Sequence, residues 1–368
     1  MYLSNNRQGR PSSSLYEFKR ADLEGRRRIV ERAGSSSLVV WQLHACASSA
    51  PLDPLEMLPY AELALELASA FDDRDLLSWA HCELGNVHRI LQDYENAKHH
   101  LNQATDLAVS DYQKADTARR HGELDLILRL DTASAFSYLE RALEVSNGAT
   151  PRIQSDRGHP MVLQSKGLAH YYHACLHDED HVELAKPLLE TVLETGCRRH
   201  AQRARRAALN NLVAIPLTFD RPIDRSLVVR LTQAYDVLRK KSSLVGARTR
   251  WALIRVEIRE QGYTEARRRR LLTVRDQIVK RGAFGYAGLL TLDIAAHDIT
   301  AGRPRRVRKL LEASRPLLER GGLEEVASAL VVNGAITEED VLEARREALL
   351  RSVLGRVAAR ALVKRLPG

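Results

Sequence analysis

Small and apolar residues recur along the chain at the spacing i, i+4, i+7, with polar residues between them. This spacing places three side chains on one face of an α-helix. The clearest instances are Ala61/Leu65/Ala68, Ala97/Leu101/Ala104 and Ala135/Leu139/Ala142. Weaker ones are Ala185/Leu189/Val192, Leu227/Leu231/Ala234, Val307/Leu311/Ser314, and a unit in which Ala266 is followed by Arg270 in place of leucine. Successive first residues lie 36, 38, 50, 42, 39 and 41 positions apart, which predicts repeated helical units.

Residues that end helices separate these units. They include Pro51, Pro54, Gly302-Arg303-Pro304, Gly321-Gly322 and Asn333-Gly334. The longest step contains Asn147 to His159, a stretch rich in glycine, proline and polar residues that predicts an exposed loop. No run of alternating β-branched residues indicates a sheet. We therefore predict an all-α chain with about seven helix pairs.

Residues 78–111 carry the most specific pattern. Leu84-Gly85-Asn86 is followed by Asp93-Tyr94-Glu95-Asn96-Ala97, with the alanine twelve residues after the glycine. This arrangement resembles a tetratricopeptide (TPR) repeat. The resemblance implies an α-solenoid, a right-handed superhelix of TPR-like pairs whose first helices line a concave groove. It also implies a non-enzymatic protein-protein interaction scaffold or regulatory adaptor that binds a peptide or protein partner.

The order of elements is also similar to the repeat region of bacterial regulators that join a helix-turn-helix domain to TPR repeats. The segments that carry this similarity are DPLEMLPYAELALELA, the repeat above, and AGRPRRVRKLLEASRPLLERGG. The stretch before residue 36 is too short for that DNA-binding domain. The resemblance therefore covers the repeat region alone.

The two ends differ from the repeats. We expect residues 1–14 to be a disordered tail and residues 15–335 to form the solenoid, beginning with a helix over 15–33 that exposes Arg26-Arg27-Arg28. Residues 336–368 predict a basic C-terminal helix that caps the last apolar face. The alternative is an amphipathic helix that binds an anionic membrane or a partner's groove.

Charge is distributed unevenly between the two halves. The net charge is +9, but residues 1–197 hold 20 Lys/Arg against 29 Asp/Glu, whereas residues 198–368 hold 36 against 18. A nucleic-acid-associated regulator that uses the basic half is the alternative function, and a solvated surface is the simpler interpretation. No segment is long and apolar enough to span a membrane, and the four scattered cysteines are typical of reduced thiols, so we expect a cytoplasmic protein.

The resemblance implies a set of partner-binding residues. On the first repeat helices it places Trp79, Asn86, Arg89 and, within LNNLVAI, Asn210. Asparagine amides can pair with a peptide backbone and arginine with a carboxylate. The alternative is that both asparagines only bridge neighbouring helices.

A stripe of Arg248, Arg255 and Arg259 lies opposite an expected buried face of Trp251, Ile254 and Ile258. The register, uncertain by one residue, decides whether this stripe faces the groove or solvent. Phosphates or acidic peptides would suit such a surface.

Other chemistry has little support in the sequence. His170, His173, His177 and His181 could pair on a metal ion, but the helix is expected to end near His177, which favours ordinary turn histidines. No nucleotide-binding, hydrolase or kinase motif occurs. We therefore expect neither enzymatic activity nor a cofactor, and the sequence names no partner or oligomeric state.

Overall fold

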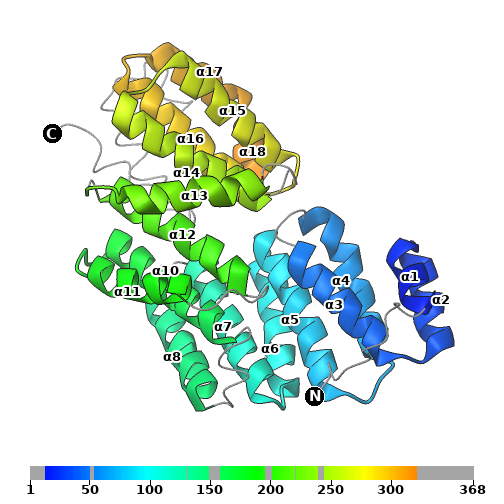
Figure 1. Ribbon diagram of the computed structural model, residues 1–368. Coiled ribbons are helices and arrows are strands. Elements are labelled where there is room, and N and C mark those ends of the chain that lie inside the picture. Colours follow the sequence, from blue (N-terminus) through cyan, green and yellow to red (C-terminus); the bar gives the residue numbers. More distant parts are fainter. Residues whose placement is uncertain are drawn as a thin grey trace.

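The computed structural model describes residues 13–49, 54–129, 131–148, 158–194, 201–219, 221–238 and 244–320. These residues are almost entirely helical, and no strand occurs among them, which confirms the all-α class (Figure 1). In chain order the helices are α1 (Ser13–Arg20), α2 (Leu23–Ala33), α3 (Ser36–Ser49), α4 (Pro54–Ala68), α5 (Arg74–Ile90), α6 (Tyr94–Leu107), α7 (Asp111–Leu124) with a π-helical continuation η1 (Asp125–Arg129), α8 (Thr132–Gly148), α10 (Gly158–Leu176), α11 (His181–Glu194), α12 (Ala201–Thr218), α13 (Arg225–Leu238), α14 (Leu244–Gln261), α15 (Glu265–Val279), α16 (Phe284–Thr300), α17 (Pro304–Ala313) and α18 (Arg315–Arg320).

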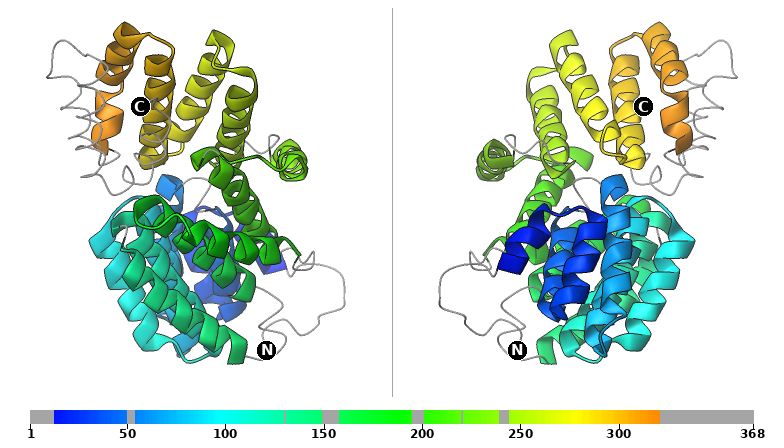
Figure 2. Two further views of the ribbon diagram at one scale, coloured as in Figure 1. Left: turned by 90° about the vertical axis from the view of Figure 1, so that its left-hand side faces the viewer. Right: turned by 90° about the vertical axis from the view of Figure 1, so that its right-hand side faces the viewer.

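The helices pack in adjacent pairs, most closely α5 with α6, α7 with α8, and α10 with α11. The helices α3, α5, α7, α10, α12 and α14 also contact one another in succession, and we call them the inner layer. Within the part of the chain that the structure describes, no comparable contact joins the second helices α4, α6, α8 and α11 to each other. The first helices therefore lie closer together than the second ones, so the stack curves toward the inner layer. Figure 2 shows the N-terminal and C-terminal parts one above the other.

In three helix pairs, a glycine of the first helix faces the alanine-leucine pattern of the second helix. Gly85, Gly122 and Gly167 stand on the first helices of three successive pairs, where an added Cβ would lie 2.8–3.0 Å from the nearest atom of the facing leucine. Those leucines are Leu101, Leu139 and Leu189, all fully buried. Glycine therefore lets the two helices of each pair approach closely.

The predicted second-helix positions lie on α4, α6, α8, α11, α13, α15 and α17, and most of their side chains are buried. The register predicted for α15 was wrong. Ala266 is exposed, and the fully buried stripe is Leu271, Val274 and Ile278, one residue later. The apolar side chains, rather than the position of the preceding Tyr263, set the face that packs.

Three local expectations at the element ends also need correction. The single helix over 15–33 is two helices, because Asp22 caps α2 by accepting a hydrogen bond from the Gly25 amide at 2.8 Å. Arg26 is buried against Gln42 rather than exposed. The two ends of the predicted loop over Asn147 to His159 are helical, since α8 extends to Gly148 and α10 begins at Gly158, and the residues between them lie outside the described part of the chain.

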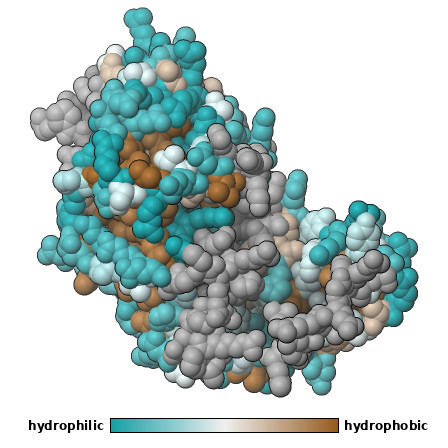
Figure 3. Space-filling view, in the orientation of Figure 1, coloured by the Kyte–Doolittle hydropathy of each residue, from teal (hydrophilic) through white to brown (hydrophobic). Residues whose placement is uncertain are grey.

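Three of the cysteines, Cys46, Cys82 and Cys175, are buried, and none of them forms a disulfide within the described residues. On the face shown in Figure 3, apolar side chains are visible around α12 to α14. Val229 and Val237 of α13 are each more than half exposed. The predicted tail was residues 1–14, and its last two residues, Ser13 and Ser14, are instead the start of α1. Residues 1–12 and the predicted capping helix over 336–368 lie outside the described residues.

Candidate functional site

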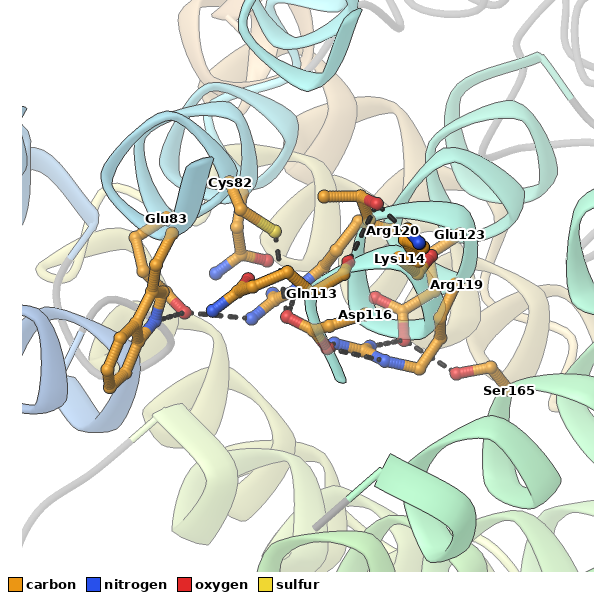
Figure 4. Close-up of polar contacts among 12 residues, drawn as sticks. Cys82, Glu83, Gln113, Lys114, Asp116, Arg119, Arg120, Glu123 and Ser165 are labelled. Carbon is orange, nitrogen blue, oxygen red and sulfur yellow. Dashed lines mark hydrogen bonds and ion pairs between the residues drawn. The ribbon is translucent and has the colours of Figure 1, made fainter. Parts of the chain in front are cut away.

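A polar network joins three successive helices of the inner layer (Figure 4). We call the following residues the inner polar network: Glu83, Asn86 and Arg89 of α5, Gln113, Asp116, Arg119, Arg120 and Glu123 of α7, and Ser165 of α10. All of these except Asp116 are buried. Buried charges are stable only when they are paired and hydrogen-bonded, so the pairing decides what this region can do.

Helix α7 supplies the centre of the network. Its N-terminus is capped by Ser110, whose hydroxyl accepts a hydrogen bond from the Gln113 amide at 3.3 Å. Asp116, Arg119, Arg120 and Glu123 then follow at spacings that place them on one side of the helix. Arg119 donates from Nε to Asp116 Oδ1 at 3.0 Å and from Nη1 to Glu123 Oε1 at 2.5 Å. One guanidinium therefore bridges both acids of its own helix.

Contacts between helices complete the network. Arg120 Nη2 of α7 donates to Glu83 Oε1 of α5 at 3.2 Å, and Ser165 Oγ of α10 donates to Glu123 Oε1 at 2.6 Å. Arg89 Nη2 lies 3.6 Å from Glu123 Oε2 and donates to Asn86 Oδ1 at 2.8 Å. The network therefore ties three helix pairs together through their first helices.

The arginines keep the acids ionised despite burial. Burial alone would raise the pKa of Asp116, but Arg119 and Arg120 more than offset this effect and lower the pKa to about 2. Burial also opposes ionisation of Glu123, and the three neighbouring arginines lower its pKa below the ordinary range. Asp116 and Glu123 therefore stay ionised near neutral pH, each paired with neighbouring arginines.

Several buried atoms of the network have no hydrogen-bond partner among the described residues. They are the donors Asn86 Nδ2 and Arg89 Nε and the acceptors Glu83 Oε2 and Gln113 Oε1. Arg120 Nε also lacks a hydrogen bond but lies 3.7 Å from Asp116 Oδ2. Because nearly all buried polar atoms in proteins are paired, unpaired ones indicate places where water or a ligand group completes the site.

The structure brings together the three residues predicted from the first repeat. Trp79, Asn86 and Arg89 all lie on α5, and Trp79 Nε1 donates to Glu83 Oε1 at 3.3 Å. The side chains of Asn86 and Arg89 are buried in the network, however, and not displayed on an open surface as expected. Arg89 is paired with Glu123 of α7, and Asn86 is hydrogen-bonded to Arg89.

Asn210 lies on α12, also in the inner layer, and is partly buried. Its Nδ2 donates to the Arg206 carbonyl at 3.1 Å and to Thr249 Oγ1 of α14 at 3.3 Å. Its Oδ1 is buried without a hydrogen-bond partner among the described residues. Asn210 therefore bridges two helices and still keeps one acceptor unused.

The arginine stripe of α14 separates into three different environments. Arg248 is exposed, with its guanidinium 4.3 Å from the centre of the Tyr286 ring. Arg255 lies 3.9 Å from Asp293, and Arg259 donates to the Pro216 carbonyl at 2.6 Å. The expected buried face is confirmed, since Ile254 and Ile258 are buried and Trp251 is partly buried.

Tyr286 of α16 lies within electrostatic range of two residues of the inner layer. Tyr286 of α16 acts electrostatically on both Arg89 of α5 and Tyr172 of α10. Burial is the main reason that the pKa of Tyr172 is raised, and Tyr286 adds to it. The inner polar network therefore lies near the exposed Arg248, which contacts the same Tyr286 ring.

Sequence reasoning missed the contribution of α7. Its charged residues indicate a solvated face when the helix is considered alone. The sequence did contain one signal for burial. Asp116, Arg119, Arg120 and Glu123 stand at i, i+3, i+4 and i+7, so the acids and arginines of this helix can form ion pairs with one another.

The predicted histidine cluster forms, but without a metal geometry. His170 Nδ1 and His181 Nδ1 are 3.1 Å apart, and His173 packs against His177 and His181. Within the described residues, no group of three or more histidine, cysteine or acidic side chains is arranged to hold a metal ion. Helix α10 ends at Leu176, as predicted from the sequence. A second pair, His81 and His100, shows the same 3.1 Å separation.

These histidines predict a loss of stability in mild acid. Burial and neighbouring histidines lower the pKa values of His100 and His170 to about 4. An unfolded histidine binds a proton below about pH 6.5, whereas these folded ones do not until about pH 4. The unfolded state therefore binds more protons in this window, and the free energy of unfolding falls as the pH drops through it.

We expect a loss of about 2 kcal/mol between about pH 7 and pH 4.5, after allowance for solvent screening. Urea unfolding at several pH values measures this loss. A variant with His100→Gln and His170→Gln should show a shallower slope. An equal slope in both proteins would contradict the assignment. Asp116 contributes a separate loss only below about pH 4, since its folded pKa is about 2.

Many arginines of the basic half are engaged within the chain. Arg268 pairs with the fully buried Asp298 at 2.7 Å, Arg270 with Glu257, and Arg306 with Glu265. These pairs reduce the positive charge that is available to an anionic partner.

The helices and the sequence were also tested for a membrane span and for similarity to known proteins. None of the helices in the described ranges has the length and apolar character needed to cross a membrane. Neither a protein-family model nor a curated protein sequence matches this chain.

Proposed function

We propose that this protein is a cytoplasmic, TPR-like interaction scaffold or regulatory adaptor without enzymatic activity. In this proposal the helix pairs form a right-handed α-solenoid, and an extended segment of a partner protein binds along the inner layer. The observation that carries the proposal is that both asparagines implied by the resemblance keep one unpaired, buried amide atom. These atoms are Asn86 Nδ2 and Asn210 Oδ1, within the described part of the chain.

The chemistry of these atoms fits a polypeptide ligand. A peptide backbone offers carbonyl acceptors and N–H donors in alternation, so it can pair with a donor at one position and an acceptor at another. Asn86 Oδ1 is already occupied by Arg89, and Asn210 Nδ2 by Arg206 and Thr249. These bonds fix each amide in one orientation and leave the opposite atom without a hydrogen-bond partner among the described residues.

The alternative, a nucleic-acid-associated regulator, has weaker support. The exposed residues Arg305 and Lys309 of α17 favour it, whereas the internal ion pairs of the basic half do not. The two functions differ in salt dependence. Binding through about six phosphates should weaken about 10³-fold or more between about 50 and 200 mM salt, whereas peptide capture should weaken far less.

A peptide selection tests the proposal. The full chain would be immobilised and used to select binders from a displayed library of random peptides, and the best peptide would then be titrated. We expect the double variant Asn86→Ala, Asn210→Ala to bind at least about tenfold more weakly, because each lost hydrogen bond is worth about 1 kcal/mol.

The matched control is Asn102→Ala, which removes an exposed asparagine of α6. It should bind the peptide as the original chain does. Circular dichroism would confirm that all variants remain folded. Equal binding by the double variant and the control would exclude the inner asparagines from the site. Recovery of no peptide would contradict the proposed function.

A further inference from the structure

We propose that Arg248 of α14 binds the carboxylate of an aspartate or glutamate side chain in the segment that lies along the inner layer. This inference rests on the proposed function and adds one charge-specific subsite to it. It names the class of partner, an acidic polypeptide segment, and the residue that selects for it.

Arg248 carries a positive charge that no acid of the described residues neutralises. Its side chain is exposed, and its guanidinium lies over the Tyr286 ring of α16, 4.3 Å from the ring centre. Within the described part of the chain it forms neither an ion pair nor a hydrogen bond. A guanidinium that lies over a ring is held by its face, so the N–H groups at its edge remain available. Two parallel N–H groups at such an edge match the two oxygens of a carboxylate.

Arg255 on the same helix shows what Arg248 lacks. Arg255 stands seven residues after Arg248 and pairs with Asp293 of α16 at 3.9 Å. Asp293 likewise stands seven residues after Tyr286, so the two contacts repeat after about two turns of both helices. Helix α16 therefore supplies a carboxylate to one arginine and an aromatic ring to the other. The ring holds Arg248 in place without neutralising its charge.

Arg248 lies beside the path proposed for the bound segment. Both Arg248 and Tyr286 act electrostatically on Tyr172 of α10, and Tyr286 also acts on Arg89 of α5. The two asparagines that define the path belong to α5 and α12, and α10 contacts α12 and, through α7, is joined to α5. The arginine is therefore near the middle of this path. A side chain within the segment, rather than the end of the segment, is the group that meets it.

The number of available charges distinguishes the classes of ligand. Arg255 pairs with Asp293, and Arg259 donates to the Pro216 carbonyl at 2.6 Å, so the rest of the α14 stripe is engaged within the chain. A nucleic acid is held through several phosphates, which need several available cations. One available guanidinium instead suits one carboxylate. A lysine at the same place in the ligand would be repelled.

Peptide libraries with one fixed position test the inference. Three synthetic libraries would carry glutamate, glutamine or lysine at the centre, uncharged residues elsewhere, and an amidated C-terminus. Their retention on the immobilised full chain would be measured. We expect the glutamate library to be retained about tenfold more than the glutamine library, because hydrogen bonds to a charged group are stronger by about that factor. The lysine library should be retained least. A fourth library, with central glutamine and a free C-terminal carboxylate, separates a side-chain carboxylate from a terminal one.

Substitutions at two positions assign the preference to this arginine. Arg248→Gln should lower the ratio of glutamate to glutamine retention by about tenfold. Tyr286→Asp places a carboxylate of the chain itself beside Arg248 and should lower the ratio in the same way. Tyr286→Phe keeps the ring and should preserve the ratio. Arg269→Gln removes an exposed arginine of α15 and is the matched control for the change in net charge. Circular dichroism would confirm that each variant is folded.

The outcomes separate the inference from the function on which it rests. Equal retention of the glutamate and glutamine libraries by the original chain would overturn the inference and leave the proposed function standing. A folded Arg248→Gln or Tyr286→Asp variant that keeps the original ratio would overturn it as well. If the free C-terminal carboxylate alone raised retention as much as central glutamate, the assignment to a side chain would be wrong. Retention of none of the libraries would overturn the proposed function and the inference together.

Discussion

Replacing Arg119 by alanine is expected to lower the free energy of unfolding by about 3–5 kcal/mol, the usual effect of breaking a buried ion pair. Arg119 is almost fully buried and bridges Asp116 and Glu123. Without it, the buried Glu123 and the partly buried Asp116 lose their nearest positive charge. Their pKa values should rise toward and above the ordinary range, because burial then acts with less opposition.

Urea unfolding near neutral pH measures this loss, and Arg27→Ala is the matched control. Arg27 pairs with Glu24 and Glu66 on the surface, where solvent screens the interaction. The control should therefore change stability far less than Arg119→Ala. Similar losses for the two variants would show that the buried ion pairs of the inner polar network do not stabilise the fold more than a surface pair does.

Replacing Gly122 by valine is expected to lower the free energy of unfolding by about 2–3 kcal/mol, as overpacking of a close contact does. An added Cβ at this position would lie 2.9 Å from Leu139 Cγ and 3.1 Å from the Ala135 carbonyl oxygen. The carbonyl belongs to the backbone of α8, so it cannot move away as a side chain could. Helices α7 and α8 must then separate.

The same substitution at Gly148 provides the control, because nothing lies within 4 Å of an added Cβ there. Thermal unfolding of both variants measures the difference, with a lower midpoint expected for Gly122→Val alone. A Gly122→Val protein as stable as the control would mean that the close approach of the two helices is not required.

The paired helices could be predicted from the sequence because their signal is local. Positions i, i+4 and i+7 define a buried face whatever the neighbouring helices do, and Leu101, Leu139 and Leu189 are indeed fully buried. The break between α1 and α2 could also have been predicted from local sequence, because Asp22 is a residue type that caps helix N-termini. The glycines that face the leucines could be found only by aligning the pairs with one another.

The site was predicted less completely because its determinants are not local. Asn86 and Arg89 were placed on the correct helix, but their burial depends on Glu123 and other residues of α7, which are distant in sequence. A charged helix face is usually solvated, so pattern alone does not indicate that α7 turns its arginines inward. Balance between acids and bases on one face is the feature that makes such burial possible.

The measurement that tests the central claim most directly is amide hydrogen exchange of the full chain with and without a selected peptide. Binding along the inner layer should slow exchange in α5, α7, α10 and α12 and change it little in α6, α8 and α11. Slowed exchange confined to α15 and α17, or spread over the second helices alone, would contradict the account and place the partner on the outer or basic surface.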